Sequence, residues 1–295
     1  MVMGVGDVKQ YIISSFISAS GGGNKAAVVL DQKGLTEKRM LEISKINNLS
    51  ETAFINIEES DGENFLIRYF TPEEEVDICG HAALASFHLL NILGHISCDE
   101  IYHKTKAGKL KVIKKNDIFF IQMKPPEIVG HSSIDDILHI TNLNKDDIIP
   151  NREGAISIVS TGLKDAIIEV RTLKALRDMS INRELMIAYC KEKNIIGAHV
   201  VSRETMEEDS DFACRNFAPA VGIDEESATG TSNASLIYYI INEGKDNVKK
   251  TPYKIEQGYF MGSKSNIYVL AFKKEEIEIF VGGKAEILET QDIDL

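Results

Sequence analysis

The sequence predicts an α+β protein of two pseudo-symmetric domains, each a curled, mostly antiparallel sheet around one central helix. The first reason is an internal repeat: the residues from Arg68 to Pro72, followed by Cys79-Gly80, return about half a chain later as Arg215 to Pro219, followed by Thr229-Gly230. The second is that each copy leads into one apolar stretch of helical length, among many short strand-like runs. The third is the length of 295 residues, which suits two domains of ordinary size.

The first strands are predicted from short runs that are rich in β-branched and aromatic residues. Val8 to Ile17 is such a run, and it ends in the polar, glycine-rich loop 18–24, which can adopt positive φ. A second strand covers Ala26 to Leu30. A later one covers Phe65 to Phe70 and stops before Pro72, because the residue that precedes a proline is conformationally restricted.

Three helices are predicted. The first begins after Thr36, a good N-cap residue, ends near Asn47-Asn48, and carries one apolar face made of Met40, Ile43 and Ile46. The other two follow the repeated glycines, from Gly80 to about Leu93 and over Ala234 to Ile241, and have almost no polar face. Because a helix without a polar face is a buried one, we expect each of them at the centre of its domain.

The domain boundary is predicted at the proline pair in the linker from Met123 to Glu127. The N-terminal domain then covers residues 1–125 and the C-terminal domain residues 126–282. A final strand near 283–295 can return to the first domain. The polar stretch 131–152 either follows the linker as connecting chain or is an ordinary surface helix and loop of the second domain.

Charge and hydropathy exclude several classes of partner. The chain is 43% hydrophobic and 26% charged, which is ordinary for a globular protein. Its formal net charge is −12 and no basic run stands out, so neither nucleic acid nor an anionic membrane is an expected partner. The segment Met1 to Gln10 does not resemble a leader and no run is long enough to span a membrane, so the cytoplasm is the expected compartment.

No cofactor motif is found in the sequence. The four cysteines lack the paired spacing of a zinc site and are interpreted as reduced thiols; they are Cys79, Cys98, Cys190 and Cys214. The run Gly21-Gly22-Gly23-Asn24 lacks the Lys-Ser/Thr of a phosphate-binding loop, and no dinucleotide fingerprint occurs. We therefore expect neither a metal nor an organic cofactor.

The N-termini of the helices at Gly80 and Gly230 are the first candidate site. Unpaired backbone N–H groups and the positive end of the helix dipole suit a carboxylate ligand, and glycine lets that ligand approach the main chain. A single glycine before a helix is more often a simple turn, but its recurrence strengthens the signal. Since the halves are alike, we expect one cleft between them that both helix N-termini face.

Three titratable residues near these termini each have two interpretations. His81 lies in the first helical turn, where the dipole should favour the neutral ring, or it is a hydrogen-bonded core histidine. Glu226 is a site residue just before Gly230, or a solvated loop acid. Glu51 precedes an apolar strand and is either a site residue or, as its local pattern favours, a surface or capping residue. The residue pattern alone leaves all three roles open.

A series of motifs runs from about Phe16 to Gly283, nearly the whole chain. The motifs are Gly22-Gly23-Asn24, Asn48-Leu49-Ser50-Glu51-Thr52, Arg68-x-Phe70-Thr71-Pro72, Asp77-x-Cys79-Gly80-His81, Phe217-Ala218-Pro219 and Ala228-Thr229-Gly230. In this order they resemble the phenazine-biosynthesis isomerase (PhzF-like) family. The resemblance implies the diaminopimelate-epimerase-like fold, a homodimer, and a cofactor-independent isomerase that binds a small carboxylate-bearing substrate in the inter-domain cleft.

The resemblance also implies roles for single residues. Glu51 is similar to the general acid/base that moves a proton between carbons, with His81 and Glu226 assisting. Backbone groups of Gly230 and Thr231 are expected to hold the substrate carboxylate, and the remaining substrate-binding positions are Asn24, Cys79, Gly80 and Thr229. A base of this kind works best if burial raises its pKa toward neutrality.

Three positions depart from the family pattern. Lys25 stands where the family usually has proline, Glu226-Ser227 replaces Asp-Pro, and the region 262–265 has no arginine. Glu226 keeps the negative charge but is one methylene longer, so its carboxylate must approach by another path. The substrate is therefore not assigned, and the phenazine precursor is not assumed.

Two alternative functions are open. A related two-cysteine epimerase or racemase of amino acids needs a thiolate at both helix N-termini, but Thr229 occupies the second. A threonine hydroxyl is far too weak a base without an activating partner. The other alternative is a non-catalytic protein that binds a small carboxylate, and Glu51 argues against it because an anion binder gains nothing from a second carboxylate near its ligand.

Overall fold

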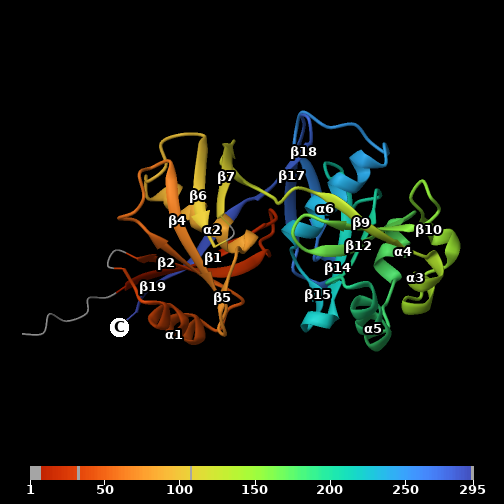
Figure 1. The fold of residues 1–295 in the computed structure, drawn as a ribbon, viewed down its shortest axis with the longest axis horizontal. Helices are drawn as coiled ribbons and strands as arrows, with labels where there is room; N and C mark the ends of the chain where they lie inside the picture. Colours follow the sequence, from red (N-terminus) through yellow and green to blue (C-terminus); the bar gives the residue numbers. More distant parts are fainter. Residues whose placement is uncertain (1–7, 32–33, 107, 294–295) are drawn as a thin grey trace, which may run out of the picture. The chain divides into compact units, whose positions relative to one another are not determined.

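The computed structural model describes residues 8–31, 34–106 and 108–293. It is a mixed α+β structure in which strands predominate (Figure 1). The chain forms two units: unit 1 comprises residues 1–121 and 282–295, and unit 2 comprises residues 122–281. The residues before Val8, on which the expectation about a leader rests, lie outside the described residues. Within the described ranges, no helix has the length and apolarity needed to cross a membrane.

Unit 1 is one continuous series of strand pairings. Its strands are β1 (Val8–Ser15), β2 (Asn24–Asp31), β3 (Thr52–Asn56), β4 (Asn64–Phe70), β5 (Glu75–Val76), β6 (Glu100–Thr105), β7 (Gly108–Lys115), β8 (Ile118–Gln122) and β19 (Ala285–Ile293). Strand β1 is antiparallel to β2, β2 is parallel to β3, β3 is antiparallel to β4, β4 is parallel to β6, and β6 is antiparallel to β7. The C-terminal strand β19 pairs with β1.

Unit 2 repeats this order of pairings. Its strands are β9 (Glu127–Ser132), β10 (Ile148–Ile149), β11 (Ile156–Ser160), β12 (Lys164–Val170), β13 (Gly197–Ser202), β14 (Phe212–Ala218), β15 (Ile223–Glu226), β16 (Tyr253–Gln257), β17 (Ser265–Lys273) and β18 (Ile277–Gly283). From β11 through β12, β13, β14, β16 and β17 the pairings are antiparallel, parallel, antiparallel, parallel and antiparallel. The sequence repeat is therefore also a repeat of sheet topology.

Each unit buries one long helix against its strands, as the absence of a polar face predicted (Figure 1). Helix α2 (Gly80–Ile92) packs against β1, β2, β3 and β19, and helix α6 (Gly230–Asn242) packs against β11, β12, β13 and β17. Both helices have 13 residues, of which eight are buried. Burial of apolar side chains stabilises each helix far more than its intrinsic propensity does.

Helix α1 (Glu37–Asn47) corrects one detail of the predicted apolar face. Thr36 caps the helix by accepting a hydrogen bond from the Arg39 backbone, as expected, but the Ile46 side chain is 74% exposed. At 3.6 residues per turn, Ile46 is rotated far from Met40, whereas Ser44 is one turn away and buried. Met40 and Ile43 are buried in an apolar cluster of unit 1, and Leu41 of the same helix packs against that cluster.

The shorter helices of unit 2 form a second apolar layer. They are α3 (Ile134–Ile140), α4 (Leu173–Asp178) and α5 (Arg183–Lys193). Ile137 and Ile140 of α3 belong to the same apolar core as Met186 and Cys190 of α5. The helix in the polar stretch 131–152 is therefore part of unit 2 rather than connecting chain, and it has a buried face.

The repeated Arg-x-Phe motif has the same structural role in both units. Arg68 makes a two-pronged ion pair with Glu75, at 2.7 and 2.8 Å, and its guanidinium lies 5.1 Å from the Phe70 ring centroid. Arg215 makes the matching pair with Glu225, at 2.9 and 2.8 Å. Such bidentate pairs are strong and geometrically specific. The motif thus fixes the strand that leads into each buried helix.

Candidate active site

In unit 1, three predicted site residues come together from two segments of the chain. Glu51 stands directly before β3, where the chain arrives from the left-handed C-cap residue Asn48 of α1. Cys79 is the N-cap residue of α2, and His81 lies in the first turn of that helix. The Ser15 hydroxyl donates a 2.8 Å hydrogen bond to the backbone oxygen of His81 and so fixes this helix start to β1.

The side chains of Glu51, Cys79 and His81 form one cluster. His81 Nε2 lies 3.2 Å from Glu51 Oε2, and His81 Nδ1 lies 3.3 Å from Cys79 Sγ. The His81 and Glu51 side chains are 11% and 20% exposed, so a small ligand can still reach them. The Glu51 Oε2 atom itself is buried and receives no well-aligned hydrogen bond from the described residues.

The His81–Glu51 contact determines the charges in this cluster. Burial disfavours the charged ring, but Cys79 and Glu51 beside it outweigh burial and raise the pKa of His81 well above its usual value. Burial raises the pKa of the Cys79 thiol, and Glu51 adds to that effect. The Cys79 sulfur and the Glu51 carboxylate, one at each ring nitrogen, are thus the two groups that favour the protonated ring of His81.

Two sequence-based expectations about charge are wrong. His81 was expected to be neutral because of the helix dipole, but a carboxylate at 3.2 Å outweighs a partial dipole charge. Glu51 was expected to have a raised pKa. Burial does act in that direction, but hydrogen bonds and charge from His81, with help from Ser50 and Cys79, leave the pKa of Glu51 below its usual value. The carboxylate is thus ionised at neutral pH and ready to accept a proton.

The other predicted residues of unit 1 lie beside this cluster. Gly80 is the first residue of α2, and an added Cβ there would meet no atom within 4 Å among the described residues, so the main chain can be approached. Asn24 begins β2 and lies opposite Ser15 in the β1–β2 register. Ser15 is the residue that holds His81, so Asn24 is one strand away from the cluster.

In unit 2, the predicted residues lie at the start of α6. Glu226 ends β15, Thr229 is the N-cap residue, and Gly230 and Thr231 begin the helix. The Thr161 hydroxyl donates a 2.9 Å hydrogen bond to the backbone oxygen of Thr231, which repeats the Ser15–His81 contact of unit 1. Neither Cys79 nor Thr229 caps its helix through a side-chain hydrogen bond within the described part of the chain.

Gln257, which the sequence analysis did not select, holds the segment between Glu226 and α6. Its amide oxygen accepts from the Thr229 backbone N–H at 3.0 Å and from the Asn233 amide at 2.8 Å. Its amide nitrogen donates to the Glu226 backbone oxygen at 2.8 Å and to the Thr229 hydroxyl at 2.9 Å. Gln257 is fully buried, so this one side chain positions both ends of the predicted binding segment.

Behind Gln257, a buried polar network continues under the first turns of α6. Asn233 contacts His199 Nε2 at 3.3 Å, and the Asn216 amide lies 3.3 Å from His199 Nδ1 and 3.1 Å from the Ser232 hydroxyl. Ser232 in turn donates to Asp165 at 2.7 Å. Burial lowers the pKa of His199 to about 4, so the ring is neutral at pH 7. Burial also raises the pKa of Asp165 to about 6, although the Ser232 hydrogen bond opposes this.

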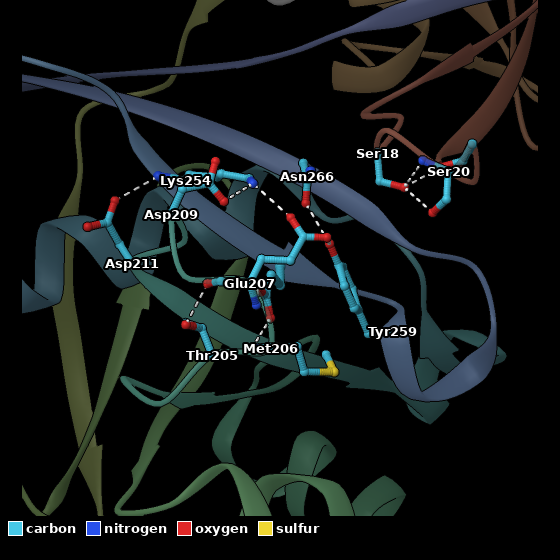
Figure 2. A network of polar contacts seen from close by, with 12 residues as sticks. Ser18, Ser20, Thr205, Met206, Glu207, Asp209, Asp211, Lys254, Tyr259 and Asn266 are labelled. Carbon is cyan, nitrogen blue, oxygen red and sulfur yellow. Dashed lines mark hydrogen bonds and ion pairs between the residues drawn. The ribbon is translucent and has the colours of Figure 1, made fainter.

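The end of β16, which carries Gln257, is itself fixed. Figure 2 shows Lys254 and Tyr259 pointing toward Glu207, with ion-pair and hydrogen-bond distances of 2.8 and 2.6 Å. Between them, Gly258 has a φ of +76°, and a Cβ there would lie 2.1 Å from the Ser263 backbone oxygen. Only glycine therefore fits between Gln257 and the following turn.

The structure thus brings the predicted residues together in two groups, one in each unit. The expectation that the two groups line one cleft concerns the placement of the units and stays a prediction. All four cysteines, each within the described ranges, are free thiols, as predicted. One arrangement was not expected from sequence spacing: a Glu51 carboxylate oxygen, Cys79 Sγ and a His81 ring nitrogen all lie within 4.8 Å of one another, as metal ligands can.

Comparison with known proteins places the fold in a class. The chain matches a probable proline racemase of Agrobacterium radiobacter with a TM-score of 0.60 over 98% of this chain and 93% of the other, at 10% identity, which shows a shared fold. A PhzF-family crystal structure from Bacillus anthracis matches with a TM-score of 0.84, 25% identity, and coverage of 98% and 99%. The fold is thus that of racemases, epimerases and related isomerases.

The family follows from sequence. The profile of the phenazine biosynthesis-like (PhzC-PhzF) family matches residues 13–291. An uncharacterized isomerase of Clostridium acetobutylicum is 33% identical over 94% of this chain and 95% of its own length, and one of Escherichia coli K12 is 30% identical over the same shares. The chain belongs to the PhzC-PhzF family and is an isomerase of that family.

Proposed function

We propose that this isomerase moves a proton between two carbons of a small carboxylate-bearing substrate, with its own side chains as the only proton carriers. The observation that carries this proposal is the contact between Glu51 and His81, in which a buried, ionised carboxylate oxygen lies 3.2 Å from a protonated ring. A base and an acid held side by side are what a proton shift requires.

The reaction follows from these charges. Glu51 accepts a proton from a substrate carbon, and the electron pair of the broken C–H bond passes into the adjacent unsaturated system. A proton then returns to another carbon, either from the Glu51 carboxylic acid or from the His81 imidazolium, and a prototropic isomer leaves with no net change in protons. His81 also stabilises the Glu51 carboxylate, so the base is ionised at neutral pH, at the cost of some basicity.

Unit 2 supplies the carboxylate anchor in this proposal. The first turn of α6 offers backbone N–H groups at Gly230 and Thr231, and no side chain within the described residues caps them. A helix N-terminus of this kind favours an anion. Glu226 assists the proton transfer, as the family resemblance implies. We propose that the helix starts of both units act on one substrate molecule.

The two-thiol mechanism receives less support. Burial raises the pKa of Cys79, which works against a thiolate base, and the Thr229 hydroxyl accepts a hydrogen bond from Gln257 rather than contacting a general base. Because proton abstraction by sulfur needs a thiolate, neither residue is prepared for that role. A single observation favours it, the 3.3 Å contact between Cys79 and His81.

The test begins with a thermal-stability screen of small amino, hydroxy and unsaturated carboxylic acids. A compound at 100 times its dissociation constant adds about 2.7 kcal/mol to the free energy of unfolding, which a melting curve resolves. Each hit is then incubated with the protein in deuterium oxide and followed by proton NMR. We expect an isomer to form, with deuterium at a carbon-bound position wherever the proton on Glu51 exchanges with solvent before it returns. A tightly bound carboxylate that is neither isomerised nor exchanged at carbon would instead identify a binding protein.

A further inference from the structure

We propose that Glu51, Cys79 and His81 form an inhibitory site for one Zn²⁺ ion. The site rests on geometry alone, whereas its inhibitory effect rests on the proposed role of Glu51 as the base. The three side chains offer one carboxylate oxygen, one sulfur and one ring nitrogen, all within 4.8 Å of one another. Zinc takes exactly these three ligand types in proteins.

The distances fit one ion bound by a single ring nitrogen. Zinc bonds of about 2.3 Å to sulfur and 2.0–2.2 Å to nitrogen and oxygen, in a tetrahedron, place the ligand atoms roughly 3.4–3.6 Å apart. His81 Nε2 lies 3.8 Å from Cys79 Sγ and 3.2 Å from Glu51 Oε2. These two distances are within a few tenths of an ångström of that geometry, and the third pair, a Glu51 carboxylate oxygen and Cys79 Sγ, lies within 4.8 Å and must move closer to complete the site.

The surroundings leave the fourth corner to water. On binding, a cation replaces the ion pair between Glu51 Oε2 and the His81 ring, which are 3.2 Å apart, and releases one proton from His81 and one from the Cys79 thiol. The Glu51 and His81 side chains are still 20% and 11% exposed, which gives an ion and one water molecule access. Three protein ligands plus water is the open form of a zinc site.

The spacing of the ligands explains why the sequence does not reveal this site. Cys79 and His81 are two residues apart, at the start of one helix, and Glu51 comes from a separate segment before β3. None of the usual paired zinc motifs has this pattern. Because zinc would occupy the carboxylate oxygen that takes the substrate proton, occupancy blocks turnover instead of supporting it.

The experiment titrates Zn²⁺ into the full-length, chelator-treated protein in competition with a chromophoric zinc indicator. We expect one ion per chain, and affinity at least about tenfold weaker in Cys79→Ser and in Glu51→Gln, because each variant removes one of three ligands. Cys98→Ser is the matched control, since Cys98 is a partly exposed thiol that contacts only the Glu100 backbone oxygen among the described residues, and it should bind like the wild type. Cobalt(II) in place of zinc should give a sulfur-to-metal charge-transfer band that Cys79→Ser lacks.

Two outcomes overturn the site: fewer than half an equivalent of zinc bound, or unchanged affinity in Cys79→Ser. Circular dichroism verifies that Cys79→Ser is folded, and if it is not, Glu51→Gln decides the question. The inhibitory effect is measured separately, as turnover with added zinc. If zinc binds but turnover does not fall, or if Glu51→Gln without zinc turns over normally, the proposed function fails while the metal site stands.

Discussion

The starts of helices α2 and α6 have the same backbone arrangement but differ in the chemistry of their side chains. Each follows an Arg–Glu pair, begins after an extended N-cap residue, and has the backbone oxygen of its second residue held by a hydroxyl from a neighbouring segment. Around α2 the side chains are ionisable: Glu51, Cys79 and His81. Around α6 they are mostly neutral amides and hydroxyls. In the proposed function, the groups at the start of α2 move the proton and those at the start of α6 hold the binding segment in shape.

The hydrogen-bond inventories of the two sites explain this division. Gln257 is satisfied at both its oxygen and its nitrogen, and Asn233 also donates to the Thr229 backbone oxygen at 2.8 Å. A fully satisfied buried network is rigid and specifies one conformation. In unit 1, by contrast, Glu51 Oε2 lacks a well-aligned donor among the described residues. Such an incomplete site costs stability but leaves an acceptor available to a substrate.

The largest difference between the sites at α2 and α6 is expected when Glu51, the proposed base, is replaced. Glu51→Gln keeps the shape of the side chain and removes the proton acceptor, so we expect turnover to fall by roughly 10²–10⁴-fold. Turnover is measured with the substrate that the carboxylate screen identifies. Glu63→Gln, at an exposed position of unit 1, is the control and should have normal turnover.

Cys79→Ser distinguishes the carboxylate mechanism from the thiol mechanism in the same assay. If Glu51 is the base, the serine variant should lose far less activity than Glu51→Gln, because the hydroxyl keeps a polar contact to His81. A thiol epimerase would show the reverse order, since only a thiolate forms easily near neutral pH. Near-normal turnover of Glu51→Gln would refute the preferred mechanism.

The next effect concerns the rigid site. Gln257→Ala removes its hydrogen bonds to the Thr229 N–H and hydroxyl, the Asn233 amide and the Glu226 backbone oxygen, and we expect a loss of about 4 kcal/mol in the free energy of unfolding. Urea denaturation measures this loss. Because the binding segment also loosens, KM should rise more than kcat falls.

The matched control for Gln257 is Lys106, whose amine donates one long hydrogen bond, of 3.4 Å, to the Glu75 backbone oxygen among the described residues. Lys106→Ala should change stability by less than about 0.5 kcal/mol, as exposed substitutions usually do. Equal effects of the two substitutions would show that the rigid network of unit 2 has no special role.

The features that depend on residues close together in the sequence could be predicted, and those that depend on distant residues could not. The buried helices α2 and α6 follow from local apolar patterning, and the Thr36 cap of α1 follows from local capping chemistry. The burial of the two helices and the cap were therefore predicted correctly. The face of α1 was predicted less well, because Ile46 was assigned by residue type without counting its rotation around the helix. The family resemblance, rather than residue patterns, selected Glu51.

The interactions that could not be predicted all depend on residues distant in sequence. The charge of His81 depends on Glu51, which lies in another segment, and local reasoning from the helix dipole gave the wrong sign. In the sequence, Gln257 is simply a polar residue at a strand end. Its role follows only from its hydrogen bonds to residues of β15 and α6. A usable signal was present in α6, where Ser232 and Asn233 interrupt an otherwise apolar buried helix.

The smallest expected effect is a pH-dependent change in stability at Asp165, the last residue of the buried polar network in unit 2. Burial raises the pKa of Asp165 to about 6, from an ordinary value near 3.8. A carboxyl whose folded-state pKa is raised stabilises the protein fully below pH 4 and loses this contribution as the pH rises through 6. Asp165→Asn stays neutral and can still accept the Ser232 hydrogen bond, so the wild type should be less stable than the variant by on the order of 3 kcal/mol at pH 8, at about 1.36 kcal/mol per pKa unit.

The control for Asp165→Asn is a carboxyl with the opposite shift. Hydrogen bonds from Arg177 and Lys174 lower the pKa of the exposed Asp178 to about 2. The stability that Asp178 contributes is therefore present above pH 4 and is lost as the pH falls toward 2, so Asp178→Asn should destabilise the protein slightly at pH 8, if at all. Thermal melts of both variants from pH 4 to 8 measure the contrast. If Asp165→Asn and the wild type have parallel pH profiles, Asp165 does not titrate in this range, and the network under α6 is not sensitive to pH.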